Sequence, residues 1–215
     1  MKEAQIRGFE ERDRTALREL FGQAGEGSPT QSLWGDKESE ADVYLNPYMD
    51  SEPGSLFVAV VDGMLVGYLT GCLDGSRFPS ESDRMRAVIA KHRLMFRRKP
   101  AAFFVRSMVD MAVTTIRRQP TAGEVEDPRW PAHLHINVLP QERSGGVGQA
   151  LMDRWLNRLR ETDSPGCYLQ TLTENSRAVR FFERVGFTKF GRTPLVPGLR
   201  YQDRRVHQQT MVWSP

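Results

Sequence analysis

The feature that most constrains the fold is a glycine-rich junction between a strand and a helix. Residues 133–139 alternate as a half-buried strand does, whereas residues 147–159 carry apolar side chains at helical spacing. The segment QERSGGVGQALM at 141–152 joins them. Its glycines allow positive φ and close backbone approach, and the first N–H groups of the helix point to the same place. The junction therefore predicts an α/β protein with either a tight turn or an anion site at this position.

An antiparallel hairpin is predicted at 55–73, where Asp62-Gly63 joins two β-rich runs, because a type I′ turn favours this dipeptide. Residues 74–130 break the strand pattern and predict an inserted helical hairpin with helices at about 83–98 and 101–118. The second helix is expected to bury apolar side chains at helical spacing, namely Phe104, Val105, Met108, Ala112 and Ile116.

The remaining segments predict a strand at 5–9, a helix from the N-cap Asp13 to Phe21, and a loop over 22–37. Further elements are a helix at 38–48 that Pro47 stops, strands at 167–173, from Phe187 and at 206–213, and helices at 147–161 and 175–185. Together these elements predict one mixed α/β domain over residues 1–215.

Composition and charge narrow the class of protein. No apolar run reaches about 18 residues and the start is charged, so a soluble cytoplasmic protein with no membrane partner is expected. Cys72 and Cys167 lie in separate strand-like runs, which predicts two buried, reduced thiols and no metal site. The formal net charge is +3, but the segment 84–118 alone carries +9. This basic segment is expected to be a solvated surface, and nucleic-acid binding is the weaker alternative.

The glycine spacing excludes two common nucleotide sites. The sequence that follows Gly146 lacks the Lys-Ser/Thr of a P-loop, and Leu151 stands at the third glycine of the Rossmann pattern. A phosphate site and a simple tight connection are both open on spacing alone.

Two motifs nevertheless resemble a known family. Arg143-x-x-Gly146-x-Gly148, after a strand ending in Val-Leu-Pro, is similar to the acetyl-CoA loop of the GNAT acyltransferases. The segment ENSRAVRFFERVGF at 174–187 resembles their second motif, Asn-x-x-Ala followed by two aromatic residues and Gly-Phe. More narrowly, HLHINVLP with this loop is similar to the acetyltransferase-like domain of animal O-GlcNAcases and its stand-alone bacterial relatives. The resemblance implies the GNAT fold, a twisted, mostly antiparallel mixed sheet flanked by helices.

The resemblance also implies acetyl-CoA as cofactor and direct attack by an amine in a ternary complex. The expected acceptor is a small molecule rather than a protein, and the protein a monomer or homodimer. On this basis the loop would bind the pyrophosphate, Val138 and Leu139 the pantetheine arm and thioester oxygen, and Asn175 the arm, unless it only caps its helix. The expected cofactor-binding residues are Asn137, Val138, Leu139, Arg143, Ser144, Gly145, Gly146, Val147, Gly148, Gln149, Asn175, Ala178 and Phe182.

His133 and His135 are the candidate bases, because imidazoles titrate near neutrality and positions i and i+2 of a strand share a face. A structural role in packing is the alternative. Aromatic candidates for the acceptor site are Trp34, Tyr44, Tyr48, Trp130 and Tyr201.

Phe182 stands where many family members carry a tyrosine that protonates the leaving thiolate. The protein is therefore expected to use another donor, such as Tyr168, Tyr201, Ser176 or water, or to transfer slowly. The alternative function is a CoA-binding pseudoenzyme that acts as a sensor or interaction module.

Overall fold

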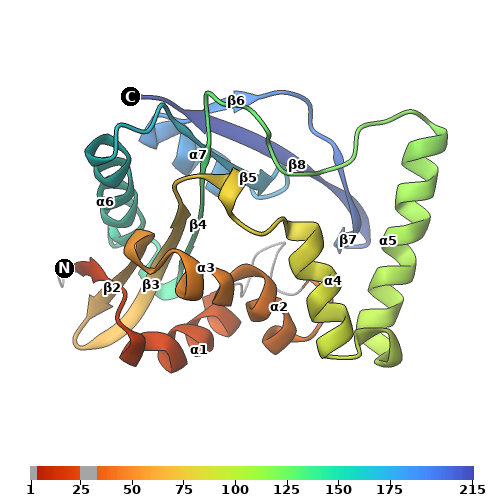
Figure 1. The fold of residues 1–215 in the computed structure, drawn as a ribbon, viewed down its shortest axis with the longest axis horizontal. Coiled ribbons are helices and arrows are strands. Elements are labelled where there is room, and N and C mark those ends of the chain that lie inside the picture. The colour runs from red at the N-terminus through yellow and green to blue at the C-terminus, as the bar shows by residue number, and fades with distance from the viewer. Residues whose placement is uncertain (1–3, 25–32) are drawn as a thin grey trace.

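The computed structural model describes residues 4–24 and 33–215 and shows a twisted sheet with helices on both faces (Figure 1). The strands run in the order β1-β2-β3-β4-β5-β8-β6, and β7 pairs with β8. Their bounds are β1 (Gln5–Gly8), β2 (Leu56–Val61), β3 (Met64–Cys72), β4 (Ala132–Val138), β5 (Cys167–Leu172), β6 (Thr188–Phe190), β7 (Leu195–Tyr201) and β8 (Arg204–Trp213). The paired strands are antiparallel except for β4 and β5, which confirms a mostly antiparallel mixed sheet.

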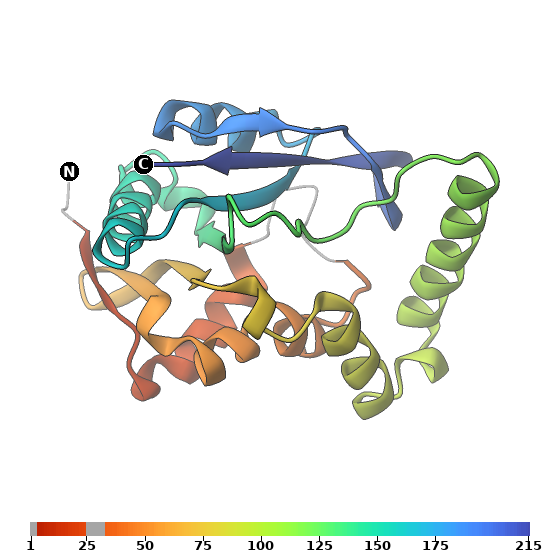
Figure 2. The same ribbon diagram turned by 45° about the horizontal axis from the view of Figure 1, so that its top comes forward.

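Two groups of helices cover the sheet, as the turned view in Figure 2 shows. The helices are α1 (Arg14–Ala24), α2 (Lys37–Tyr44), α3 (Asn46–Ser51), α4 (Glu81–Lys91), α5 (Arg98–Ile116), α6 (Val147–Glu161) and α7 (Ser176–Val185). Helices α1 to α3 bury Leu17 and Tyr48 against one face, whereas α6 and α7 bury Trp155 and Phe182 against the other. Trp155 lies so close to β3 that a Cβ on Gly71 would meet its ring at 2.2 Å, which explains the glycine.

The parallel pair β4–β5 diverges soon after it begins. Its register holds at Ala132↔Cys167 and His133↔Tyr168, although both strands continue for several residues. The two strands are therefore separated over the rest of their length, as a groove between them requires.

The hairpin prediction is confirmed, because Asp62 and Gly63 adopt φ of 50° and 78° between β2 and β3. Asp13, in contrast, is not a simple N-cap. Its carboxylate accepts two hydrogen bonds from Arg7, at 2.6 and 2.7 Å, and one from the N–H of Glu10. It thereby ends a 3-10 turn that precedes α1.

Several predicted boundaries differ from the structure, among them that of α5, which begins at Arg98 and contains Pro100. The helix predicted at 38–48 is two helices, and Pro47 lies in the first turn of α3, where its missing N–H costs no hydrogen bond. The helix predicted at 83–98 ends at Lys91, because Arg93 adopts a left-handed φ of 50°. Helix α1 extends to Ala24, and residues 25–32 of the predicted loop lie outside the described residues.

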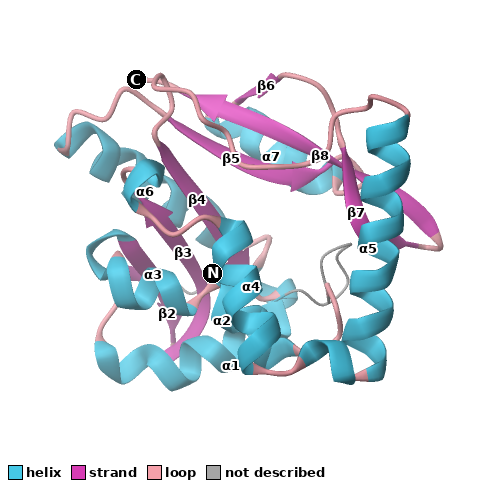
Figure 3. Ribbon diagram, turned by 45° about the vertical axis from the view of Figure 1, so that its right-hand side comes forward, coloured by secondary structure: helices cyan, strands magenta, loops and turns pink. Residues whose placement is uncertain are grey.

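The apolar stripe predicted to be buried on α5 faces outward instead. Phe104 is buried, but Val105, Met108 and Ile116 are 54, 61 and 81% exposed, and Ala112 is exposed as well. The helix lies at the edge of the molecule beside β7 (Figure 3). Its buried Asp110 accepts hydrogen bonds from Arg200 and from the N–H of Gly198 on β7, and this pairing orients the helix.

Cys72 and Cys167 are buried and unpaired, as predicted. Over residues 4–24 and 33–215, the structure contains no helix with the length and hydropathy that a membrane span requires.

Candidate active site

A cavity of about 670 Å³ opens where β4 and β5 separate. One end, which we call the loop end, adjoins the N-termini of α6 and α7. Its lining includes Asn137, Val138, Arg143, Gly148, Asn175, Ser176, Arg177, Ala178, Phe181, Phe182 and Arg184. The other, which we call the α4 end, adjoins α2, α4, β5 and β7. Its lining includes Lys37, Glu40, Tyr44, Glu81, His135, Gln170, Glu174, Leu199, Tyr201 and Gln208.

The glycine loop ends in the first turn of α6. Gly146 precedes the helix with φ 79° and ψ −5°, a left-handed conformation that favours glycine, and no side chain caps the helix. The N–H groups of residues 147–149 therefore have no acceptor within the helix. A Cβ on Gly148 would approach the ring of Phe181 to 3.3 Å, so the backbone here is close to α7. The loop thus presents a row of donors that suits an anion.

The loop residues contribute in different ways. Arg143 and Gly148 line the cavity, whereas Val147 is buried in the core and the Gln149 amide bonds to Asp153. Ser144, Gly145 and Gly146 do not belong to the lining, so any contact they make with a ligand comes from outside the cavity proper.

Arg143 ties the loop to its surroundings. Its Nε donates to the Val138 carbonyl at 3.1 Å, and its NH2 donates to the Ala24 carbonyl at 2.7 Å. Burial, together with the nearby Arg177, lowers the pKa of Arg143 from its ordinary value, but a guanidinium stays charged in proteins. Arg143 therefore positions the loop and makes this end of the cavity positive.

Of the two backbone groups predicted to bind the pantetheine arm and thioester, Val138 faces the cavity. Leu139 donates its N–H to the Val66 carbonyl at 2.9 Å and does not belong to the lining, so its N–H is not available to a thioester oxygen. Because N–H groups alternate between the edges of a strand, that of Val138 points toward β5. At this point β5 has already separated from β4, so the N–H faces the groove.

Helix α7 supplies the other wall of the loop end. The Asn175 Oδ1 accepts the Ala178 N–H at 3.2 Å, so Asn175 is an N-cap, and both residues line the cavity. Phe182 also lines it but is 6% exposed, with its ring packed between Phe181 and Phe187. The phenyl ring therefore offers no proton at this position, as the sequence predicted.

The two histidines share one tyrosine. The Tyr48 hydroxyl lies 2.9 Å from His133 Nε2 and 3.0 Å from His135 Nε2. Burial, with the charges of His135 and Arg84, lowers the pKa of His133 to about 3, and burial with Arg84 lowers that of His135 to about 4. Both imidazoles are therefore neutral near pH 7.

The hydrogen bonds also assign their tautomers. A tyrosine hydroxyl has one proton, so it donates to one imidazole and accepts from the other. His133 Nδ1 is buried without a partner among the described residues, and an orphaned N–H costs more there than an orphaned lone pair. His133 therefore carries its proton on Nε2, and Tyr48 donates to His135. The proton of His135 then sits on Nδ1.

These features disfavour the histidines as bases. His133 is 6% exposed and does not line the cavity, so it is a structural histidine behind Tyr48. His135 lines the cavity but presents an N–H donor and has a strongly lowered pKa. The prediction that these residues deprotonate an amine finds no support in this geometry.

The structure brings to the site four residues that sequence reasoning did not select as polar site groups. Tyr44 donates its hydroxyl to Glu81 Oε1 at 2.6 Å, across 37 residues of sequence. Gln170 and Gln208 lie on β5 and β8 and both direct their amide nitrogens at the Gly123 carbonyl. The sequence offered one signal for Gln170, because it is a polar residue in a strand whose first three residues are apolar and buried. Among the aromatic candidates, Tyr44 and Tyr201 line the cavity, and Trp34, Tyr48 and Trp130 pack in the interior.

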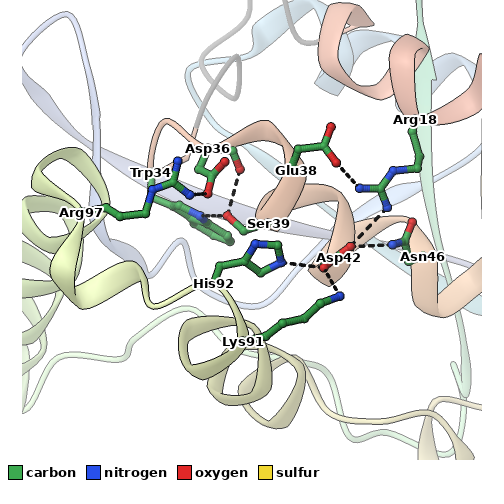
Figure 4. Close-up of polar contacts among 10 residues, drawn as sticks. All are labelled: Arg18, Trp34, Asp36, Glu38, Ser39, Asp42, Asn46, Lys91, His92 and Arg97. Carbon is green, nitrogen blue, oxygen red and sulfur yellow. Dashed lines mark hydrogen bonds and ion pairs between the residues drawn. The ribbon is translucent and has the colours of Figure 1, made fainter. Parts of the chain in front are cut away.

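A polar network holds the C-terminal end of α4 against α2 (Figure 4). At the other end of α4, Glu81 bonds to Tyr44 of α2. The carboxylate of Asp42 accepts hydrogen bonds from Lys91 and His92 at 2.7 Å, and it also contacts Arg18 and Asn46. Burial opposes the charge, but the bonds from Lys91, His92 and Arg18 hold the pKa of Asp42 below its ordinary value. The α4 end is therefore anchored by contacts outside the cavity.

Comparison with known proteins adds to this geometry. The model of the acetyltransferase (GNAT) family matches residues 16–187. The fold is similar to that of SsHAT, with 22% identity, a TM-score of 0.63 and coverage of 99% of this chain and 98% of that one. It is also similar to yncA, a putative acetyltransferase from Salmonella typhimurium solved with acetyl-CoA (15% identity, TM-score 0.60, coverage 98% and 93%). A third similar fold is the ribosomal-protein-alanine N-acetyltransferase of Brucella melitensis (18% identity, TM-score 0.58, coverage 98% and 99%).

Proposed function

The chain belongs to the acetyltransferase (GNAT) family, whose cofactor is acetyl-CoA, and we propose that it transfers the acetyl group to the primary amine of a small molecule. The observation that carries this proposal is the set of unpaired N–H groups at the start of α6, beside the groove between β4 and β5. When bound, acetyl-CoA supplies a thioester that an amine attacks directly.

The loop end fits the cofactor. The N–H groups of residues 147–149 and the charge of Arg143 suit a pyrophosphate, because donors at a helix N-terminus bind anions. The N–H of Val138, turned into the groove, would hold the thioester oxygen as it gains negative charge. Asn175 would donate its amide nitrogen to the pantetheine arm, since its Oδ1 already caps α7.

The α4 end fits a small acceptor. An alkyl ammonium has a pKa of about 10.4, so only about one part in a thousand is neutral near pH 7.4. The acceptor amine must therefore lose a proton before it attacks. Tyr44, Glu81 and His135 are polar groups of α2, α4 and β4 that line this end of the cavity. Helix α4 and strand β7 wall this end, which favours a small molecule over an extended protein tail.

Phe182 motivates a second candidate function, a catalytically weak protein that binds acetyl-CoA as a sensor or interaction module. Its ring lines the loop end and has no proton to give to a departing thiolate. We favour transfer, because a thiol with a pKa near 8.5 leaves tolerably as the thiolate near neutrality.

The test combines two measurements on the purified chain. Calorimetry reports acetyl-CoA binding, and a thiol reagent reports release of CoA in the presence of a panel of primary amines. We expect binding and amine-dependent thiol release. Binding with no release for any amine would favour the sensor, and absence of binding would exclude both functions.

A further inference from the structure

We propose that the α4 end selects an acceptor with a second, cationic nitrogen, as in an α,ω-diamine or a polyamine. This inference rests on the proposed function, which accounts for the nitrogen that is acetylated. It concerns what holds the rest of the acceptor.

The orientation of two glutamine side chains is the first argument. The Nε2 atoms of Gln170 and Gln208 donate to the Gly123 carbonyl at 2.5 and 3.3 Å. A carbonyl oxygen only accepts, so this contact assigns the amide nitrogen in each side chain. The Oε1 atoms therefore point away from Gly123, and both residues line the cavity. They offer two hydrogen-bond acceptors to a ligand.

Glu81 adds a charged acceptor. Its Oε1 accepts from Tyr44, and Oε2 has no partner among the described residues. Burial and the charge of Glu81 raise the pKa of Tyr44 well above its ordinary value, so the phenol keeps its proton and donates it in the hydrogen bond to Glu81. A ligand that reaches this carboxylate meets a negative charge within a partly enclosed cavity.

The distribution of charge along the cavity is the third argument. The arginines of the lining, Arg143, Arg177 and Arg184, lie before α6 and along α7. Of its carboxylates, Glu40 and Glu81 lie on α2 and α4, and Glu174 directly precedes the N-cap of α7. Glu40 already accepts backbone N–H groups at 33–35, and Glu174 faces His207. The cation of the α4 end, Lys37, donates to the Gly22 carbonyl. Glu81 is thus the carboxylate placed to meet a ligand.

Acceptors outnumber donors at this end. The donors in the lining are the Lys37 ammonium, which already bonds to the Gly22 carbonyl, the Nδ1–H of His135 and the hydroxyl of Tyr201. Against them stand the carboxylates of Glu40 and Glu81 and two amide oxygens. An ammonium group brings three N–H donors and a positive charge, so it satisfies this set, whereas a carboxylate would meet repulsion. Because the attacking amine must be neutral, the charge that Glu81 binds belongs to a second nitrogen.

The experiment compares three series of primary amines of equal chain length, α,ω-diaminoalkanes, 1-aminoalkanes and ω-amino acids, together with spermidine. We expect kcat/KM for the best diamine or spermidine to exceed that of the matching monoamine by roughly 10- to 100-fold, as for a charged hydrogen bond. The amino acid should be the poorest of the three.

The variant that tests the assignment is Glu81→Gln. It keeps an oxygen for the Tyr44 hydroxyl and removes the charge. We expect it to abolish most of the diamine advantage while acetyl-CoA affinity is unchanged. Asp83→Asn, on the exposed side of the same helix turn, is the matched control and should behave as the wild type. Equal rates for diamines and monoamines, or an unchanged preference in Glu81→Gln, would overturn the inference.

Direct calorimetry of diamine and spermidine binding separates this inference from the proposed function. Binding that Glu81→Gln weakens, without any thiol release, supports the subsite and contradicts acetyl transfer. Thiol release that is indifferent to the second nitrogen supports transfer and contradicts the subsite.

Discussion

At the loop end of the cavity, the groups proposed to bind the cofactor come from residues 138–149 and from the start of α7, two short stretches with recognisable motifs. At the α4 end, the lining groups are side chains from α2, α4, β4, β5 and β8. The first end is built by local conformation, and the second by contacts between distant segments. The loop end should therefore be sensitive to substitutions that alter or obstruct its backbone. The α4 end should be sensitive to substitutions of its side chains.

The sharpest way to break the comparison is to obstruct the backbone at the loop end with Gly148→Leu. The new side chain would press on the ring of Phe181 and obstruct the N–H groups of α6. Each lost charge-assisted contact costs about 1.5–3 kcal/mol, so the Kd for acetyl-CoA should rise at least about 100-fold. Calorimetry measures this. Gly8→Leu, at a glycine with open space around its Cβ position, is the control and should bind normally.

The next largest effect belongs to the side-chain network behind the α4 end. Tyr48→Phe removes the hydroxyl that both histidines share and leaves the Nε2 atoms of both imidazoles without a hydrogen-bond partner. We expect the free energy of unfolding to fall by about 1–3 kcal/mol in urea denaturation. Tyr201→Phe removes a hydroxyl that has no partner among the described residues. If it cost as much as Tyr48→Phe, the shared hydrogen bonds would not be the cause.

Acidification tests the same network without mutation. An unfolded histidine titrates near 6.5, whereas His133 and His135 have folded pKa values of about 3 and about 4. The unfolded chain therefore binds more protons below pH 6.5, so stability is complete above that pH and falls as pH drops toward the folded values. Between pH 6.5 and about 5 each histidine should contribute a loss approaching about 1.4 kcal/mol per pH unit.

Denaturation at several pH values measures this slope. His135→Gln should remove about half of it. A flat profile above pH 5 would contradict the neutral, buried state of the pair.

The smallest expected effect is at Asn175. Its side chain caps α7 and is also proposed to bind the pantetheine arm. Asn175→Ala should lose about 1 kcal/mol of stability with the helix cap. Asn175→Asp keeps an oxygen for the Ala178 N–H and should restore stability, but both variants lack the amide nitrogen. We expect acetyl-CoA affinity to fall about fivefold in both, as for one neutral hydrogen bond. Full affinity in Asn175→Asp would restrict Asn175 to capping.

The same division explains which predictions from sequence succeeded. Asp62-Gly63, Gly146 and Asn175 act on their immediate neighbours, so their turn, helix start and cap were predictable from a few residues. The orientation of α5 was not predictable in this way. Apolar residues at helical spacing define one face of a helix, but the spacing does not say whether that face packs on the sheet or faces solvent. Contacts from Asp110 to β7 turn Val105 and Ile116 toward solvent.

By itself, the sequence determined most of the sheet and helix elements, the glycine loop and the motifs of the family, since these depend on local backbone preference and short spacings. Only the tertiary structure decided the α4 end. It joins Tyr44 to Glu81 across 37 residues, and Tyr48 to His133 across 85. Burial then lowers the pKa values of both histidines, because desolvation penalises their charged form. Desolvation and long-range pairing exist only once the chain has folded, and for that reason the spacing of residues could not reveal them.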